Sequence, residues 1–299
     1  MTITISNAYV QSFERNVRLV AQQGEAKLRN FVHEVMDSSK AHNWDVLGSA
    51  DARSKTAARM VSPAGGDGSG AVGGTAGLAW TRRKSTIATY DAGEVIEHED
   101  IAQMLADPNA PVTMALGNAM KRKVDDVIIA AATAAAKNGD DTTTAFTSAQ
   151  TVGNGTTVID LDDLLAIQEI FLGNDVDVDE EKCLVIGPTQ YRSLMSIEKI
   201  TSADYQSLKA LASGYLPNFL GFHHVILSNR LANPATGQIN CLAFTTKAIG
   251  LHVAADISAR VAERSDMSFA WQLYCAMSIG AVRIEDKKVV KLHLKDATS

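Results

Sequence analysis

Three consecutive stretches decide the expected fold: SKTAARMV (residues 54–61), AGGDGSGAVGGTAG (64–77) and LAWTRRKSTIATY (78–90). The outer two are strand-like, and the middle one holds seven of the chain's 21 glycines. Glycine gives the backbone freedom and weakens compact packing. The pattern therefore predicts a long two-stranded flap with a glycine-rich tip. Because a lone hairpin is only marginally stable in water, such a flap needs another surface to steady it.

The flap and the segment that follows it carry opposite charges. The cations of the flap are Arg53, Lys55, Arg59, Arg82, Arg83 and Lys84. Residues 91–107 contain no Lys or Arg, and their acids include Glu94, Glu97, Glu99 and Asp100. One interpretation is a solvated strand pair with ordinary surface charges. The other is complementarity between the flap of one copy and the acidic segment of another copy, which predicts all these residues as inter-subunit contacts.

Two helical patterns flank the flap. Residues 7–36 predict an amphipathic arm, whose apolar face must lie on the protein's own body or on a neighbour. Residues 111–137 carry the strongest helix pattern, with prolines before it and Asn138-Gly139 after it. At 1.5 Å per residue this helix is about 39 Å long, which suits a structural spine.

The second half of the chain alternates between strands and helices. Residues 138–160 are rich in Thr, Gly and Asn and predict a loop or a short hairpin. A helix is expected after Asp160, its N-cap, followed by a buried strand at 183–187 and a helix opened by Pro188. Further strands follow, and this alternation from 160 to 260 indicates an α/β subdomain. Residues 268–294 predict strands with a tight reversal near residues 285–287.

Composition limits the class of protein. The chain has 299 residues, of which 46% are hydrophobic, and a net charge of −6. These values exclude wholesale disorder and argue against a broad basic patch that grips nucleic acid, although not against enclosing it. No signal peptide or membrane span is visible. We expect the three cysteines to be buried free thiols in a reducing compartment.

Motifs that carry catalysis or bind cofactors are missing or incomplete. The glycine-rich tip lacks the Gly-Lys pair of a phosphate-binding loop. Asp175, Asp177 and Asp179 are spaced like the start of a calcium loop, but Glu180 and Ile186 stand where Gly and Glu are needed. No HExxH, CxxC or G-x-S-x-G occurs. We therefore predict no catalytic, metal-binding or cofactor-binding residues, although a dispersed Ser/His/Asp triad is not excluded by sequence.

The order of these parts, more than any motif, resembles the major capsid protein of tailed bacteriophages, the Johnson or Hong Kong 97-like fold. The most familiar stretches are NAYVQSFERNVRLVAQQ, CLVIGPTQYRSLMS, TSADYQSLKALASGYLPNFLGFHHVILSN and the carboxy-terminal AIGLHV…FAWQLYCAMSIGAVRIEDKKVV. The resemblance covers nearly the whole chain. It implies an α+β fold with an N-arm, an extended β-hairpin loop, a peripheral domain with a long spine helix, and an α/β axial domain.

The resemblance also implies a division of the chain. Residues 1–46 match the N-arm and residues 47–100 the extended loop. Residues 101–149 match the peripheral domain, with the spine helix at 111–137. Residues 150–262 match the axial domain, and residues 263–299 return to the peripheral domain.

The function that the resemblance implies is structural. Such a protein is not an enzyme and has no cofactor. It assembles with itself into hexamers and pentamers, and these form the icosahedral head shell of the virion. The shell is assembled in the host cytoplasm and encloses double-stranded DNA without sequence-specific binding, and no membrane is involved. A separate scaffolding protein, a portal and a decoration protein are the further expected partners. The alternatives are an encapsulin-like nanocompartment shell and an α/β enzyme that uses residues 150–260.

Overall fold

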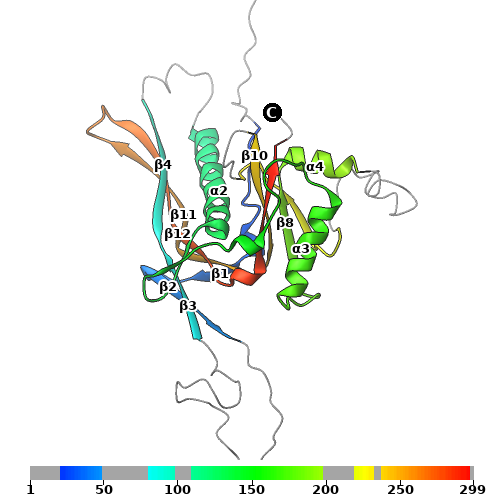
Figure 1. Cartoon of the computed structure of the whole chain (residues 1–299). Helices are drawn as coiled ribbons and strands as arrows, with labels where there is room; N and C mark the ends of the chain where they lie inside the picture. The colour runs from blue at the N-terminus through cyan, green and yellow to red at the C-terminus, as the bar shows by residue number, and fades with distance from the viewer. Residues whose placement is uncertain (1–20, 49–79, 98–108, 198–218, 232–236, 297–299) are drawn as a thin grey trace, which may run out of the picture. The chain divides into compact units, whose positions relative to one another are not determined.

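A computed structural model of the chain describes residues 21–48, 80–97, 109–197, 219–231 and 237–296 (Figure 1). It shows an α+β fold in which the main helix, α2 (Asn109–Thr133), accompanies several sheets. The chain divides into two compact units. One comprises residues 1–26, 89–123 and 255–278, and the other comprises residues 27–88, 124–254 and 279–299.

A five-stranded sheet forms the core of the second unit. Its order is β7-β13-β10-β8-β9, with the bounds Thr151–Val152, Val289–Lys295, Gln238–Thr245, Lys182–Ile186 and His224–Leu227. β10 is antiparallel to both neighbours, whereas β8 pairs with β9, and β13 with β7, in parallel. Every residue of β8 is buried, as expected for a central strand covered on both faces.

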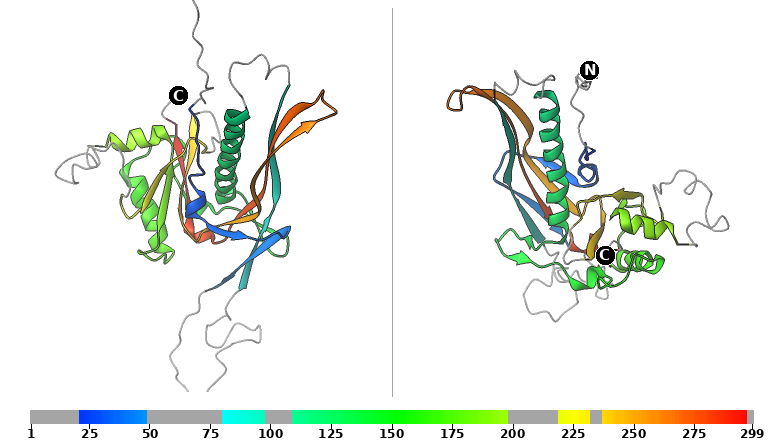
Figure 2. Two further views of the ribbon diagram at one scale, coloured as in Figure 1. Left: turned by 180° about the vertical axis from the view of Figure 1, so that it is seen from behind. Right: turned by 90° about the horizontal axis from the view of Figure 1, so that it is seen from above.

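Two helices lie beside this sheet (Figure 2). α3 (Leu161–Gly173) begins at Asp160, whose side chain forms a capping box with Asp163. α4 (Pro188–Met195) has its proline in the first turn, where the missing N–H costs nothing. Both starts agree with the sequence prediction.

A second, four-stranded sheet has the order β1-β11-β12-β4. Its strands are β1 (His33–Met36), β11 (Ile249–Arg264), β12 (Ala270–Arg283) and β4 (Ala88–Ile96). β1 runs parallel to β11, with His33 opposite Gly250. The predicted reversal after β12 is confirmed: the short 3-10 helix η3 (Asp286–Lys288) joins it to β13. Two other short 3-10 helices are η1 (Arg29–Phe31) and η2 (Ser148–Gln150).

The expected flap forms a two-stranded ribbon, but with a different first strand at its base. β2 (Ala41–Leu47) pairs antiparallel with β3 (Trp80–Thr86), so the ribbon starts before the predicted extended loop. The predicted strand at 54–61 lies outside the described residues. The expected strand 78–90 divides into β3 and β4. At the junction, a Cβ on Gly280 would lie 2.2 Å from the Thr86 carbonyl oxygen, so β12 approaches this backbone more closely than a side chain would allow.

Two further expectations need correction. The arm was expected to stay helical to residue 36, yet β1 begins at His33 because it pairs with β11. The spine helix ends at Thr133 and not at Lys137, because Ala136–Lys137 forms β5 and pairs with β6 (Thr143–Thr144). Residues 289–295 form β13, which pairs with β10 in the five-stranded sheet. The division into an N-arm, an extended loop, a peripheral domain and an axial domain stays a prediction.

The three cysteines are free and buried, as the sequence predicted. Burial raises the pKa of the Cys183 and Cys241 thiols to about 12, because an apolar interior disfavours the thiolate. These thiols are therefore packing groups rather than nucleophiles. None of the helices in the described part of the chain is long and apolar enough to cross a membrane.

Candidate functional site

The base of the β2–β3 ribbon has two chemically different faces. Side chains alternate between the faces of a strand, and here Trp44, Arg83 and Ser85 are buried while their neighbours point outward. The indole N–H of Trp44 donates to Ser85 Oγ at 3.2 Å. Trp44 packs in a small apolar cluster with Ala136 and Val282. One face of the ribbon is thus anchored in the unit that contains it.

Arg83 is the polar anchor of the buried face. Its guanidinium donates to Asn138 Oδ1 and, at 2.6 Å, to Asp286 Oδ2. The backbone around it is paired as well, because Gly139 N donates to the Arg82 carbonyl at 2.9 Å. β3 is therefore joined to the β5–β6 hairpin and to η3 at the same point.

Asp286 connects this anchor to the end of the spine helix. Its second oxygen accepts from Arg283 Nε at 2.5 Å. Arg283 is 0% exposed and also donates to the carbonyls of Ala132 and Ala134, at 3.0 and 2.8 Å. A cation at the carboxyl end of a helix satisfies its free carbonyls and opposes the helix dipole. The chain Arg83–Asp286–Arg283 thus couples the ribbon base to the α2 terminus.

The opposite face of the ribbon is apolar at its far end. Leu47 and Trp80 stand directly opposite each other in the register, and they are 48% and 73% exposed. Two residues further along β3, Arg82 forms a two-pronged ion pair with Asp45, with contacts of 2.6 and 3.1 Å. The Arg82 guanidinium lowers the pKa of the Asp45 carboxyl through these hydrogen bonds.

Lys84 completes the exposed face. Its ammonium contacts Asp141 Oδ1 at 2.7 Å, and this contact lowers the pKa of Asp141. Exposed ion pairs of this kind contribute little to stability, about 0–1 kcal/mol for an average pair, because water already solvates both charges. Arg82 and Lys84 can therefore exchange their partners at low cost, whereas Arg83 cannot.

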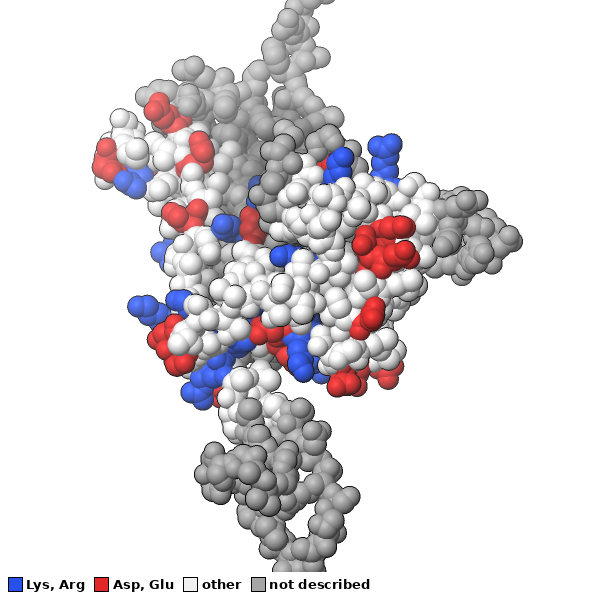
Figure 3. Space-filling model, in the orientation of Figure 1, with Lys and Arg blue, Asp and Glu red and all other residues white. Residues whose placement is uncertain are grey.

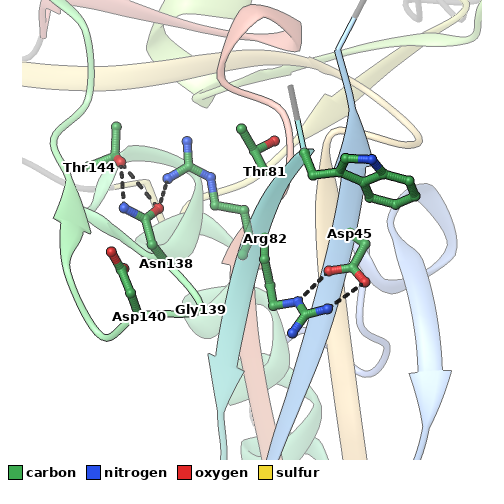
Figure 4. Close-up of a pocket in the computed structure, with 9 residues that line it drawn as sticks. Asp45, Thr81, Arg82, Asn138, Gly139, Asp140 and Thr144 are labelled. Carbon is green, nitrogen blue, oxygen red and sulfur yellow. Dashed lines mark hydrogen bonds and ion pairs between the residues drawn. The ribbon is translucent and has the colours of Figure 1, made fainter. Parts of the chain in front are cut away.

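A depression of about 710 Å³ opens beside the ribbon base. It is lined by Asp45, Trp80, Thr81, Arg82, Arg83, Asn138, Gly139, Asp140 and Thr144. Figure 4 shows the Arg82–Asp45 pair on one side of β3 and the polar cluster of Asn138 and Thr144 on the other. Cations and acids also interleave around this base on the molecular surface (Figure 3). A surface on which positive and negative side chains alternate is better suited to contact with another protein than with a polyanion.

The structure brings together only some of the residues predicted from sequence. Arg82, Arg83 and Lys84 lie together on β3. Glu94 and Glu97 are exposed and belong to the other compact unit. Arg53, Lys55, Arg59, Glu99 and Asp100 lie outside the described residues, so the predicted pairing between copies stays a prediction.

Sequence reasoning missed the partners of the ribbon cations. Asp45, Asp141 and Asp286 hold Arg82, Lys84 and Arg83 within the same chain. Asp45 stands between Trp44 and Val46 in AHNWDVL, a pattern that could have indicated a strand but not its pairing with residues 80–86. Asp286 lies 203 residues from Arg83 and gives no local signal. Within the described ranges, no three His, Cys, Asp or Glu side chains are grouped to hold a metal ion.

Comparisons with known proteins identify the architecture. A family model described as phage capsid protein matches residues 5–296. The chain belongs to the phage capsid protein family. It is thus a capsid protein of the virion head shell, and neither the nanocompartment nor the enzyme alternative is favoured. No curated protein matches it.

Solved structures show the same fold at low sequence identity. The structure from Mycobacterium phage Che8 aligns with a TM-score of 0.73 at 15% identity and covers 97% of this chain and 98% of its own. The capsid structure of cyanophage P-SCSP1u gives 0.71 at 16% identity, covering 97% and 94%. The capsid asymmetric unit of cyanophage Pam1 gives 0.73 at 11% identity, covering 98% of each. The capsid fold expected from the order of parts is therefore confirmed.

Proposed function

We propose that this protein is the major building block of the head shell and assembles with itself into hexamers and pentamers around double-stranded DNA. The observation that carries the proposal is the outward face of the ribbon, where Trp80 and Leu47 are exposed next to weakly held charges. An exposed aromatic beside polar groups is typical of protein contact surfaces. The opposite face of the same ribbon is locked to its own subunit, so the ribbon presents its outer face at a defined position.

Contacts of this kind are heterologous, because one surface meets a different surface on the next copy. Repeated around an axis, they close a ring. Each contact can be weak, since many contacts act together in a shell. A structural role, without catalysis or a cofactor, is part of the same proposal.

The proposed cargo is genomic DNA held without sequence recognition. A net charge of −6 disfavours tight binding to phosphates, which leaves packaged DNA free to move against the wall. A scaffolding protein, a portal and a decoration protein remain proposed partners, and assembly is proposed to take place in the host cytoplasm.

Expression of the full chain, with and without the scaffolding gene from the same genome, tests this function. Size-exclusion chromatography and electron microscopy are expected to show capsomers or closed shells of megadalton size. A small soluble oligomer under both conditions, with no particles, would contradict the proposal.

A further inference from the structure

One carboxylate is buried within the spine helix α2. Asp125 is fully buried, whereas its neighbour Asp126 is partly open to water and pairs with Arg230 at 2.6 Å. A buried carboxylate costs free energy unless hydrogen bonds replace the water that it loses. An apolar side chain would pack here at least as well, so the acid indicates a role other than filling the interior.

The partners of Asp125 are two consecutive backbone amides far away in the sequence. Lys27 N donates to Oδ2 and Leu28 N donates to Oδ1, each at 3.0 Å, across 98 and 97 residues of chain. Leu28 is the N-cap of η1, and its own side chain makes no capping hydrogen bond. A Ser, Thr, Asp or Asn at the N-cap normally supplies such an acceptor. Asp125 therefore supplies, from another helix, the acceptor that the start of η1 lacks.

Further contacts hold the same turn within its unit. Leu28 is fully buried. Lys27 Nζ donates to the Leu227 carbonyl at 2.7 Å, and the Phe31 ring lies 4.7 Å from the His224 ring, both on β9. The blue turn of η1 lies beside α2 in Figure 2. Because one carboxylate holds two successive N–H groups, it fixes both the position and the direction of the backbone here.

The residues just before this turn are held differently. Lys121 Nζ donates to the Gly24 carbonyl at 3.0 Å, and Arg122 Nη1 donates to Gln22 Oε1 at 2.7 Å, both at the exposed surface. Exposed hydrogen bonds from long side chains open at low cost, because water replaces the partner. These contacts belong to the other compact unit. The change from exchangeable surface contacts to a buried backbone anchor falls at residues 26–27.

We infer that Asp125 is a positioning residue for assembly. It holds the backbone at Lys27 and Leu28, and it thereby fixes where and in which direction the chain before residue 27 leaves the body of the subunit. The inference rests on the proposed function, since a fixed exit matters for assembly only if the subunit builds a shell. Pre-organisation of this kind lowers the ordering cost of every contact made in the shell.

Amide hydrogen exchange of the free subunit tests the anchor. Asp125→Asn keeps the side-chain volume but puts an NH₂ group against a backbone N–H. The amides of Lys27 and Leu28 are expected to exchange about tenfold faster or more. Asp126→Asn is the matched control, because it removes the same charge from an exposed ion pair. It is expected to leave both amides unchanged.

Electron microscopy of particles tests the positioning role. With the scaffolding gene from the same genome, Asp125→Asn is expected to give about tenfold fewer regular shells, and open or aberrant particles instead. Ile167→Val makes a small cavity in the buried core of α3 and controls for a general loss of stability. It is expected to give regular shells, as is Asp126→Asn. A merely structural role would make Asp125→Asn assemble like Ile167→Val.

A second pair of variants removes the anchor without changing Asp125. Lys27 is exposed, and Lys27→Pro deletes the N–H that donates to Oδ2. Lys27→Met loses only the Nζ contact to Leu227 and serves as its control. Lys27→Pro is expected to reproduce the aberrant particles, and Lys27→Met to give regular shells. This pair decides the role if Asp125→Asn does not fold.

The outcomes separate the inference from the proposed function. Unchanged exchange at Lys27 and Leu28 in folded Asp125→Asn overturns the anchor. Regular shells from Asp125→Asn or from Lys27→Pro overturn the positioning role and leave the shell function standing. A wild-type chain that never forms particles overturns the function itself.

Discussion

The two faces of the β2–β3 ribbon carry similar residues with different consequences. Arg82 and Arg83 are neighbours, and each forms an ion pair of 2.6 Å. The Arg83 pair lies against the helix terminus and the η3 turn, where few water molecules can replace it. The Arg82 pair is open to water. The difference teaches that a cluster of cations in sequence can contain both a structural anchor and an adaptable contact group.

The largest loss of stability is expected on substitution of Arg283, which is linked to the buried face of the ribbon through Asp286. Arg283→Met removes the donors to Ala132 and Ala134 and one partner of Asp286. Unfolding of the free subunit in urea should show a loss of about 4 kcal/mol, because buried acceptors are left unpaired. Arg264→Met is the control. Its ion pair with Asp266 is exposed, so its effect should stay within experimental error, and equal losses would contradict the comparison.

Arg83→Met is expected to destabilise the subunit by about 3 kcal/mol in the same measurement. The loss is smaller than for Arg283, since Arg283 also donates to the carbonyls of Ala132 and Ala134 and is the more deeply buried of the two. Arg82→Met should leave the stability of the free subunit nearly unchanged. If the two neighbouring variants were equally unstable, the distinction between the faces would be wrong.

Substitution of two glycines by alanine tests the same difference between the faces through steric crowding. A Cβ on Gly250 would lie 2.6 Å from Cε2 of the buried Trp44 ring, so Gly250→Ala should cost about 2 kcal/mol through overpacking. A Cβ on Gly139 would also come within 2.6 Å of an atom, but that atom is Cδ of the exposed Arg82. Gly139→Ala should therefore cost less, because the arginine can move aside. The melting temperatures of the two variants measure the difference.

The smallest expected effect is a change in the pKa of Asp45. The hydrogen bonds from Arg82 lower the pKa of Asp45 below its ordinary 3.8. A lowered native pKa means that the stabilisation is present above the ordinary pKa and is lost as the pH falls through the native one. Carboxyl-carbon NMR titration of Arg82→Gln should show the Asp45 midpoint rising towards 3.8. An unchanged midpoint would mean that Arg82 does not hold this carboxylate in solution.

Local sequence rules determined many of the elements. The Asp160 capping box, Pro188 in the first turn of α4, the apolar run of β8 and the reversal after β12 each depend on a few adjacent residues. Their outcome was predictable because capping, φ restriction and continuous burial act over one or two turns of chain. The order of these elements was also enough to indicate the capsid family.

Only the tertiary structure decided the partners. The pairing of β3 with residues 41–47, the end of α2 at Thr133 and the place of β13 beside β10 all depend on segments distant in sequence. The same holds for Arg83, whose anchor Asp286 lies 203 residues away. A sequence pattern records which residues favour a strand or carry a charge. It does not show which distant strand will pair with such a strand, or which distant acid will pair with such a cation. That choice depends on how the whole chain packs to exclude water.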